Sequence, residues 1–274
     1  RTAHTFELEA VADIDAGRAN LHAAVAIDAG ARVGRAHFAA GLAALAVLSL
    51  SVLSEIPDVG GWFAAISAVV AIVAVKPLLP SGTLLARRGL PSVILLRGLV
   101  AAAFFGAEVY LPYLLIQNYE YTPTLAGLAL TLGGLAWAGA SWLQGRLGER
   151  LTHVACTTIG SSLVLLAILA VFATAVLSLS PEIAIIGWVF GGGGMGLMYP
   201  RISTMTLALS TPANQGFNSS AMSISDSMGG ALALATTGIV FAAFAGAGLS
   251  FAGVFAFAAV IVIAAIAVAP RVTR

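Results

Sequence analysis

The chain has 274 residues, of which 59% are hydrophobic and only 9% charged, and its formal net charge is +1 at pH 7. Soluble domains carry about 25% charged residues, so this composition excludes a soluble protein of the same size and predicts a membrane protein. The thirteen basic residues are scattered, so no nucleic-acid partner is expected, and the single cysteine, Cys156, excludes an internal disulfide framework or a cysteine metal site.

Residues 1–35 form a polar segment ahead of the apolar part of the chain. They hold four arginines, five acidic residues and two of the four histidines, and no apolar run among them is long enough to span a bilayer. We expect a polar cytoplasmic arm or linker here. Because the chain begins with Arg1 and no signal-peptide pattern opens it, we interpret it as a fragment whose start is missing.

Eight apolar runs follow, separated by short polar breaks. Each is close to the roughly 20 residues that a helix needs to cross about 30 Å of hydrocarbon, and inside lipid the backbone must satisfy its own hydrogen bonds. We therefore predict an all-α, multi-pass transmembrane helix bundle. The predicted spans are 36–54, 62–80, 96–117, 124–144, 154–178, 183–200, 217–242 and 248–269.

The longest interior polar break, at 81–95, is interpreted as a cytoplasmic linker between two groups of helices. Two helices within 36–80 precede it, and a six-helix bundle within 96–274 follows it.

The distribution of charge predicts the orientation of these helices. From residue 60 onwards every lysine and arginine falls in or beside the loops of one face, whereas the loops of the opposite face hold acids and no basic residue. The positive-inside rule places the basic face and the C-terminus in the cytoplasm of a cell membrane. The basic residues are Lys76, Arg87, Arg88, Arg97, Arg146, Arg150, Arg201, Arg271 and Arg274. Four aromatic residues near the predicted interfaces are typical of an aromatic belt: Tyr119, Tyr121, Trp188 and Tyr199.

Glu108 is one of two acids inside the predicted spans. It lies twelve residues into the span 96–117, about 18 Å along the helix and just past mid-membrane. A charge there costs about 2.5–3.5 kcal/mol on insertion scales, so it is a functional candidate by default. Pro112 cannot donate a hydrogen bond to the Glu108 carbonyl, and Arg97, about three turns away, shares its helix face near the cytoplasmic mouth. The alternative role for Glu108 is a structural hydrogen bond to a neighbouring helix.

Asp226, the second acid, lies nine residues into the span 217–242, also near mid-membrane. Ser219 and Ser223 share its helix face and give a polar stripe in an otherwise apolar helix. This stripe either belongs to a substrate or proton pathway or ties two helices together. Gln117, near the outer mouth of the first bundle helix, is a weaker candidate for the same pathway.

The stretch "FGGGGMGLMYP" (190–200) looks like a phosphate-binding loop but lacks the strand, the lysine and the aqueous setting of one. Glycines at helical spacing favour close helix packing, and four in succession loosen a helix that bends during a conformational cycle. The predicted gating or packing positions are Gly187, Gly191, Gly192 and Gly196, together with Pro112 of the span 96–117. Arg201, just after Pro200, is interpreted as closing this helix at the membrane interface, with a substrate or gating contact as the alternative.

Enzyme signatures are missing from the sequence. No GxxxxGK[ST] loop is present, and no pair of histidines has the spacing of metal ligands. No nucleophile or pair of catalytic residues recurs at one depth. We therefore expect neither catalysis nor a cofactor or metal.

Three stretches resemble the major facilitator superfamily of transporters, in particular its bacterial drug:proton antiporter-like members. "GAEVYLPYLLIQNYEYTPTLAGLALTLGGLAWAGASWLQGRLGERLTH" (106–153) is similar to the first helix pair of the family's C-terminal half. Within it, "GRLGER" (145–150) is similar to the degenerate copy of the family's cytoplasmic loop motif. The stretches 187–201 and 210–238 are similar to its tenth helix and to the loop and eleventh helix. The resemblance covers about 80–274.

The resemblance implies a C-terminal six-helix bundle that partners a missing N-terminal half of the same protein. It also implies that the helices 96–117 and 183–200 line a central cavity. The glycines and arginines of the cytoplasmic loop motif would be Gly145, Arg146, Gly148 and Arg150. The two helices within 36–80 lack the glycine–proline signature of the family's fifth helix. They are either the last pair of a twelve-helix protein or the extra central pair of a fourteen-helix one.

The function expected from these features is secondary active transport, namely proton-coupled efflux of small drug-like or amphipathic compounds by alternating access. Without an ATP site the energy would come from an ion gradient, and Glu108 would alternate between its protonated and ionised forms. The expected partners are the lipid bilayer, a small-molecule substrate and protons. Two other classes stay open: a membrane-embedded enzyme or scaffold, and a passive channel, which would need a ring of polar residues along a pore.

Overall fold

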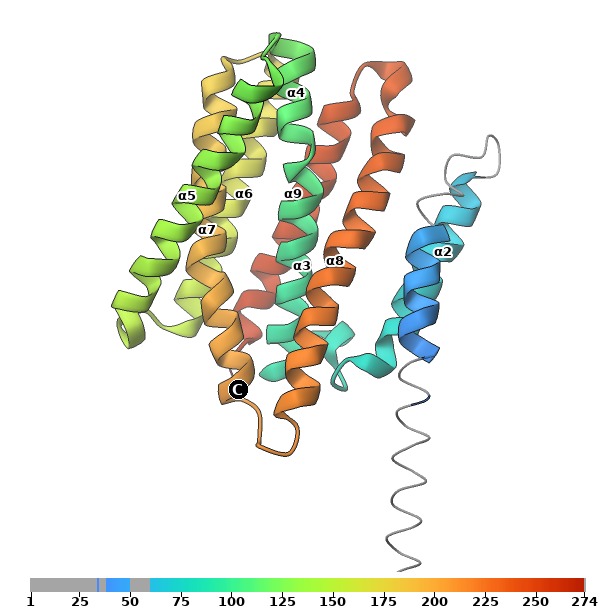
Figure 1. Cartoon of the computed structure of the whole chain (residues 1–274), viewed down its shortest axis with the longest axis vertical. Helices are drawn as coiled ribbons and strands as arrows, with labels where there is room; N and C mark the ends of the chain where they lie inside the picture. Colours follow the sequence, from blue (N-terminus) through green and yellow to red (C-terminus); the bar gives the residue numbers. More distant parts are fainter. Residues whose placement is uncertain (1–33, 35–37, 50–59, 274) are drawn as a thin grey trace, which may run out of the picture.

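The computed structural model describes residues 34, 38–49 and 60–273, and this part of the chain is helical, without a strand (Figure 1). Two helices come first, Phe38–Ser49 and α2 (Gly60–Val75). The main bundle follows and consists of α3 (Leu90–Glu108), α4 (Tyr110–Tyr119), α5 (Pro123–Leu147), α6 (His153–Leu177), α7 (Pro181–Ala208), α8 (Gln215–Ala243) and α9 (Ser250–Val268).

Six helical segments of the bundle are long and apolar enough to cross a membrane, which confirms a multi-pass membrane protein. α3 and α4 together form one of them, Leu90–Tyr119, with 30 residues. Within the described residues, the two N-terminal helices have fewer than the roughly 20 residues needed for a crossing. The loop predicted between them, 55–61, lies mostly outside the described residues. The predicted polar arm also lies outside them, except for residue 34.

α3 begins at Leu90, six residues before its predicted start and inside the segment predicted as a linker (81–95). Gly89 has a φ of +83°, which favours glycine, and its N–H donates to the Arg271 carbonyl at 2.8 Å. Pro91 then occupies the first turn of the helix, where a missing N–H leaves no intrahelical bond unmade. The polar break therefore ends at Gly89, and the extra turn is packed inside the bundle.

α7 runs to Ala208, eight residues beyond Pro200, where the sequence predicted the helix to end. An internal proline removes one backbone hydrogen bond, here the bond to the Gly196 carbonyl. The Ser141 hydroxyl of α5 donates to this carbonyl at 3.1 Å, so the freed acceptor is satisfied and the helix continues. Arg201, interpreted above as an interfacial residue, is in fact only 7% exposed.

The packing of the bundle relates its first three spans, which contain α3, α5 and α6, to its last three, α7, α8 and α9. α7 packs most extensively on α5 and α6, α3 packs on α8 and α9, and α6 packs on α9. Exchanging α3 with α7, α5 with α8 and α6 with α9 leaves the contact between α6 and α9 unchanged and interchanges the other four contacts in pairs. The first three spans and the last three thus pack in the same way, although the sequence shows little internal symmetry.

Glycines make the closest contacts between the first three spans and the last three. A Cβ on Gly192 of α7 would overlap the α5 backbone at Gly133, and a Cβ on Gly229 of α8 would overlap the α3 backbone at Gly98. Approach this close requires small residues. The four predicted glycine positions all lie at such contacts: Gly192 and Gly196 face α5, whereas Gly187 and Gly191 face α6. Their gating role stays a prediction.

Candidate functional site

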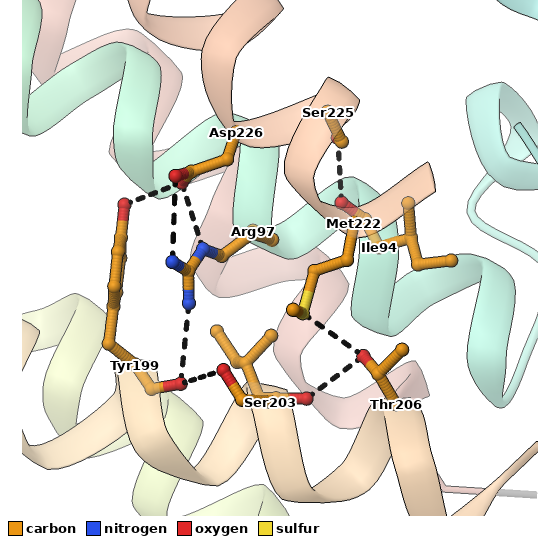
Figure 2. Close-up of polar contacts among 9 residues, drawn as sticks. Ile94, Arg97, Tyr199, Ser203, Thr206, Met222, Ser225 and Asp226 are labelled. Atoms are coloured by element: carbon orange, nitrogen blue, oxygen red, sulfur yellow. Dashed lines mark hydrogen bonds and ion pairs between the residues drawn. The ribbon is translucent and has the colours of Figure 1, made fainter. Parts of the chain in front are cut away.

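An ion pair joins α3 to α8 inside the bundle. Arg97 Nε lies 2.8 Å from Asp226 Oδ1, and Arg97 Nη2 lies 3.5 Å from Asp226 Oδ2 (Figure 2). Two guanidinium nitrogens therefore face the two oxygens of one carboxylate, the geometry that the planar fork of arginine favours. The sequence grouped Arg97 with Glu108, whereas the structure pairs it with Asp226.

Tyr199 of α7 completes this cluster, which we call the charged triad (Arg97, Asp226 and Tyr199). The Tyr199 hydroxyl donates to Asp226 Oδ1 at 2.8 Å. Its ring lies against the guanidinium, with 3.5 Å between Arg97 Cζ and the ring centroid, and its carbonyl accepts from Arg97 Nη1 at 3.4 Å. Stacking and hydrogen bonding together fix the arginine. The triad thus ties α3, α7 and α8 to one another (Figure 2).

The triad lies well inside the spans. At 1.5 Å per residue, Arg97 is about 11 Å from the start of α3, Tyr199 about 14 Å from the end of α7, and Asp226 about 17 Å from the start of α8. All three of these helix ends lie at the lower end of the bundle in Figure 1. The side chains of Arg97 and Asp226 are 14% and 28% exposed. Charges held this deep in a membrane bundle are expensive, which marks the triad as the leading functional candidate.

Aromatic rings form a continuous wall beside the triad. Trp137 of α5 meets Tyr199 edge-on at 5.0 Å between ring centroids and stacks against Phe105 at 6.4 Å. Phe104 then lies 5.8 Å from Trp137 and 4.8 Å from Trp188, again between centroids. Phe104 and Trp188 belong to the buried core, whereas the partly buried Phe105 and Trp137 can pack against the apolar part of a ligand while the charged groups meet its polar part.

The contact between α3 and α8 next to the triad is held by short-range interactions. The Ser225 hydroxyl donates to the Ile94 carbonyl at 2.8 Å (Figure 2), and Gly98 and Gly229 bring the two backbones together. Gly98 and Ser225 directly adjoin the two charged residues in the sequence. The backbone that carries each member of the ion pair is therefore fixed.

Glu108 lies apart from the triad. It is the last residue of α3, half-buried, about 17 Å beyond Arg97 along the same helix face. α4 begins at Tyr110, two residues before Pro112, so the acid and the helix break coincide. The Glu108 carboxylate makes no hydrogen bond or ion pair with any described residue. The structural alternative, a hydrogen bond to a neighbouring helix, therefore finds no partner in the described part of the chain.

Gln117 also lies away from the triad, in the last turns of α4. Its side-chain Nε2 donates to the Tyr113 hydroxyl one turn earlier at 2.7 Å, and the residue is exposed. This bond is local to one helix. The structure therefore does not bring Gln117 together with the other predicted pathway residues.

The predicted loop motif (145–150) makes the turn between α5 and α6. Gly148 has a φ of +49°, and its carbonyl accepts a hydrogen bond from Arg201 of α7. With its amide oxygen turned towards Arg201, Gln144 also accepts from Arg201 Nε at 3.1 Å. Arg146 Cζ lies 4.2 Å from the Trp142 ring centroid, whereas Gly145 and Arg150 are exposed. Arg201 thus connects this turn to α7.

Sequence reasoning missed Tyr199 and Trp137 as residues of this site. Tyr199 was assigned to the aromatic belt because its helix was expected to end at Pro200, and the longer α7 places it inside the bundle. The signal that could have suggested the ion pair is simple: opposite charges in two apolar helices must find partners within the membrane. The partner of Arg97 could be guessed from this rule, but the aromatic wall could not.

Among the described residues, no three histidine, cysteine, aspartate or glutamate side chains gather closely enough to hold a metal ion. A comparison with models of known protein families gives no match, and a comparison with curated proteins gives none either. Fold and site define a multi-pass helical membrane protein that carries a charged triad inside its bundle.

Proposed function

We propose that the protein is a secondary active transporter of the major-facilitator type, which exports small drug-like or amphipathic compounds in exchange for protons by alternating access. The observation that carries this proposal is the charged triad within the spans. Ionisable groups that pair inside a membrane mark substrate or ion pathways. Phe105 and Trp137, the partly buried rings beside the triad, offer a surface for the apolar part of such compounds.

Asp226 is the group of the triad that a proton can neutralise. While it is ionised, Arg97 and Tyr199 both bind it, and α3, α7 and α8 stay joined. Protonation removes the negative charge and weakens both contacts, since hydrogen bonds to charged groups are about twice as strong as neutral ones. Proton occupancy therefore changes how firmly three helices hold together. A link of this kind between protonation and helix packing is what coupling requires.

Glu108 supplies a second protonatable group on the same face of α3. Its carboxylate has no ionic partner among the described residues, so it can accept a proton or a cationic substrate group without first releasing another side chain. It also adjoins the helix break before Pro112, where α3 and α4 can change their relative direction. We assign to Glu108 the exchange with substrate and to Asp226 the linkage between helices.

The architecture supports the same class of protein. Many secondary transporters are built from structural repeats, and the two three-helix units of this bundle pack in matching ways. In the proposed arrangement the bundle works against an N-terminal half of the same protein. The bundle end that carries Arg87, Arg146 and Arg271 then faces the cytoplasm of a cell membrane.

A membrane-embedded enzyme or scaffold and a passive channel are the competing classes. A channel would need polar groups repeated along a pore, whereas the triad is a closed cluster whose members bind one another. An enzyme would need a nucleophile with a base or a metal site. The one hydroxyl of the triad, that of Tyr199, donates to a carboxylate that Arg97 also binds, so both groups are engaged in joining helices, which favours transport.

Transport by the full-length protein, reconstituted in proteoliposomes, tests the proposal. Ethidium serves as a fluorescent lipophilic cation, and entrapped pyranine reports proton movement. We expect dye movement against its gradient when a pH gradient is imposed, with protons moving the opposite way. In the Glu108→Gln variant, dye movement should no longer follow the size of the pH gradient.

The matched control is Glu120→Gln, which removes an exposed acid in the turn after α4 and should leave transport unchanged. If Glu108→Gln keeps the pH dependence of the unmodified protein, Glu108 does not couple transport to protons. If Asp226→Asn keeps it as well, the proposed site is wrong.

A further inference from the structure

The backbone of α7 around Pro200 receives side-chain hydrogen bonds from a neighbouring helix where its own bond is missing. Pro200 has no N–H, so the Gly196 carbonyl loses its normal intrahelical donor. The Ser141 hydroxyl of α5 occupies this place, at 3.1 Å from the carbonyl oxygen. A helix carbonyl left without a donor inside a bundle would destabilise the helix. The Ser141 hydroxyl therefore stabilises α7 by replacing the missing donor.

Two more helices bond the same segment of α7 from other sides. Cys156 Sγ of α6 donates to the Leu197 carbonyl at 3.1 Å. Arg97 of α3 donates to the Tyr199 carbonyl at 3.4 Å (Figure 2). Three neighbouring helices therefore hold one short stretch of backbone, and one of the three donors belongs to the charged triad.

We propose that residues 196–201 of α7 form a hinge and that Ser141 is the positioning residue that latches it. With the Ser141 bond made, α7 stays continuous and Tyr199 is held in place on Asp226. With the bond broken, α7 bends at Pro200 and moves Tyr199 away from the carboxylate. The inference concerns the mechanics of the bundle and does not depend on what is transported.

The glycines of α7 make such a bend feasible. Gly196 lacks the Cβ that would overlap the α5 backbone at Trp137, so the Ser141 hydroxyl can reach the main chain. Gly193, one turn before the hinge, faces open space, with no atom within 4 Å of a built Cβ. Glycine also lowers the cost of departing from helical geometry. The segment is therefore close-packed where it is latched, and α7 has open space beside Gly193, one turn earlier.

Cys156 provides a direct reporter of the hinge. It is the single cysteine of the sequence, it is fully buried, and its thiol bonds the hinge segment itself. The experiment measures the rate at which N-ethylmaleimide alkylates Cys156 in membranes that contain the protein. Alkylation requires the contact between α6 and α7 to open, so the rate follows the population of the open hinge.

We expect Ser141→Ala to raise the alkylation rate about 3- to 10-fold, the factor that one net hydrogen bond represents. Ser141→Thr keeps the hydroxyl and should stay within about 2-fold of the unmodified protein. Thr131→Val removes another hydroxyl of α5, which bonds only the Gly127 carbonyl of its own helix. This control should change the rate by less than about 2-fold.

The decisive comparison repeats Ser141→Ala in a Pro200→Ala background, where the N–H of residue 200 can again bond the Gly196 carbonyl. There the loss of the hydroxyl should change the rate by less than about 2-fold. An equal effect of Ser141→Ala in both backgrounds overturns the latch, because Ser141 then acts by packing alone. No effect in either background overturns it as well.

The Pro200→Ala background also provides a test if Ser141→Ala does not fold. If Ser141→Ala aggregates on size-exclusion chromatography, adding Pro200→Ala should restore the monodisperse peak. A double variant that aggregates like the single one contradicts the proposal.

Discussion

Arg97 and Asp226 are 129 positions apart in the sequence, yet Arg97 Nε lies 2.8 Å from Asp226 Oδ1 across the contact between α3 and α8. This pairing leaves the two interior acids in different states. Asp226 is bound on both sides, by a guanidinium and by the Tyr199 hydroxyl, whereas Glu108 has no partner among the described residues. Asp226 can therefore hold helices together, while Glu108 stays available to bind a proton or a cationic group.

The ion pair predicts an asymmetric response to mutation. Removing one member of a buried pair leaves the other charge uncompensated at a cost of about 3–5 kcal/mol. Because Asp226 is 28% exposed, we expect Asp226→Ala to lower the free energy of unfolding by about 1–3 kcal/mol. The double variant Arg97→Leu, Asp226→Ala should lose less than the sum of the two single variants. Unfolding of the purified protein in mixed micelles of increasing SDS fraction measures all three, and strictly additive losses would contradict the pairing.

Tyr199 contributes a hydrogen bond that can be removed without disturbing its ring. Tyr199→Phe should lower the free energy of unfolding by about 0.5–1.5 kcal/mol, because the stack on Arg97 and the contact with Trp137 are kept. The effect should largely vanish in an Asp226→Ala background, where the acceptor is gone. A double-mutant cycle in the same SDS titration checks this, and an equal loss in both backgrounds would show that the hydroxyl acts elsewhere.

Two adjacent glycines of α7 offer a matched test of the helix packing. Gly192→Ala places a methyl group on the α5 backbone at Gly133, and overpacking of this kind costs about 1–3 kcal/mol. Gly193→Ala meets no atom within 4 Å and should be neutral or stabilising by up to about 1 kcal/mol, since alanine favours the helix. Melting temperatures of the purified variants compare the two. Similar melting temperatures would mean that α5 and α7 are not in close contact.

The sequence predicted an all-helical membrane protein and six of the spans, because apolar length alone selects a membrane helix. Its errors share one physical origin, which is that tertiary contacts repair local defects. Pro200 signals the end of a helix, yet α7 continues because a hydroxyl from α5 replaces the missing N–H. The arginine and polar residues before the predicted first bundle helix signalled a linker, yet α3 already begins at Leu90 inside the bundle.

The candidate site was predicted only in part, for a related reason. Arg97, Glu108 and Asp226 stand out individually, because each is a charge within an apolar run. Which of them meet depends on the contact between α3 and α8, where Gly98 and Gly229 set the distance between the backbones. Helix spacing along one chain segment carries no information about such a contact. Tyr199 was misplaced because the length of α7 was misjudged.

The proposed orientation predicts which turns can be reached from outside the cell. Ser178 lies in the turn between α6 and α7, and Gly145 lies in the last turn of α5, at the opposite end of the bundle; both residues are exposed. Each is replaced by cysteine, as Ser178→Cys or Gly145→Cys, in a Cys156→Ala background. A membrane-impermeant maleimide applied to intact cells should label Ser178→Cys, and should label Gly145→Cys only after permeabilisation. Labelling of Gly145→Cys in intact cells, and of Ser178→Cys only after permeabilisation, would show that the proposed orientation is inverted.

Uphill transport driven by an imposed pH gradient tests the central claim most directly. Proteoliposomes that contain the full-length protein are equilibrated with a lipophilic cation, so that its concentration is equal inside and outside. Ethidium is the first of a panel of such cations. A pH gradient is then applied across the membrane. The account predicts that at least one cation accumulates on the more acidic side, that protons move in the opposite direction, and that both flows stop in an Asp226→Asn, Glu108→Gln variant. Cation movement that only ever follows its own concentration gradient, at the same rate with and without the pH gradient, would contradict the account.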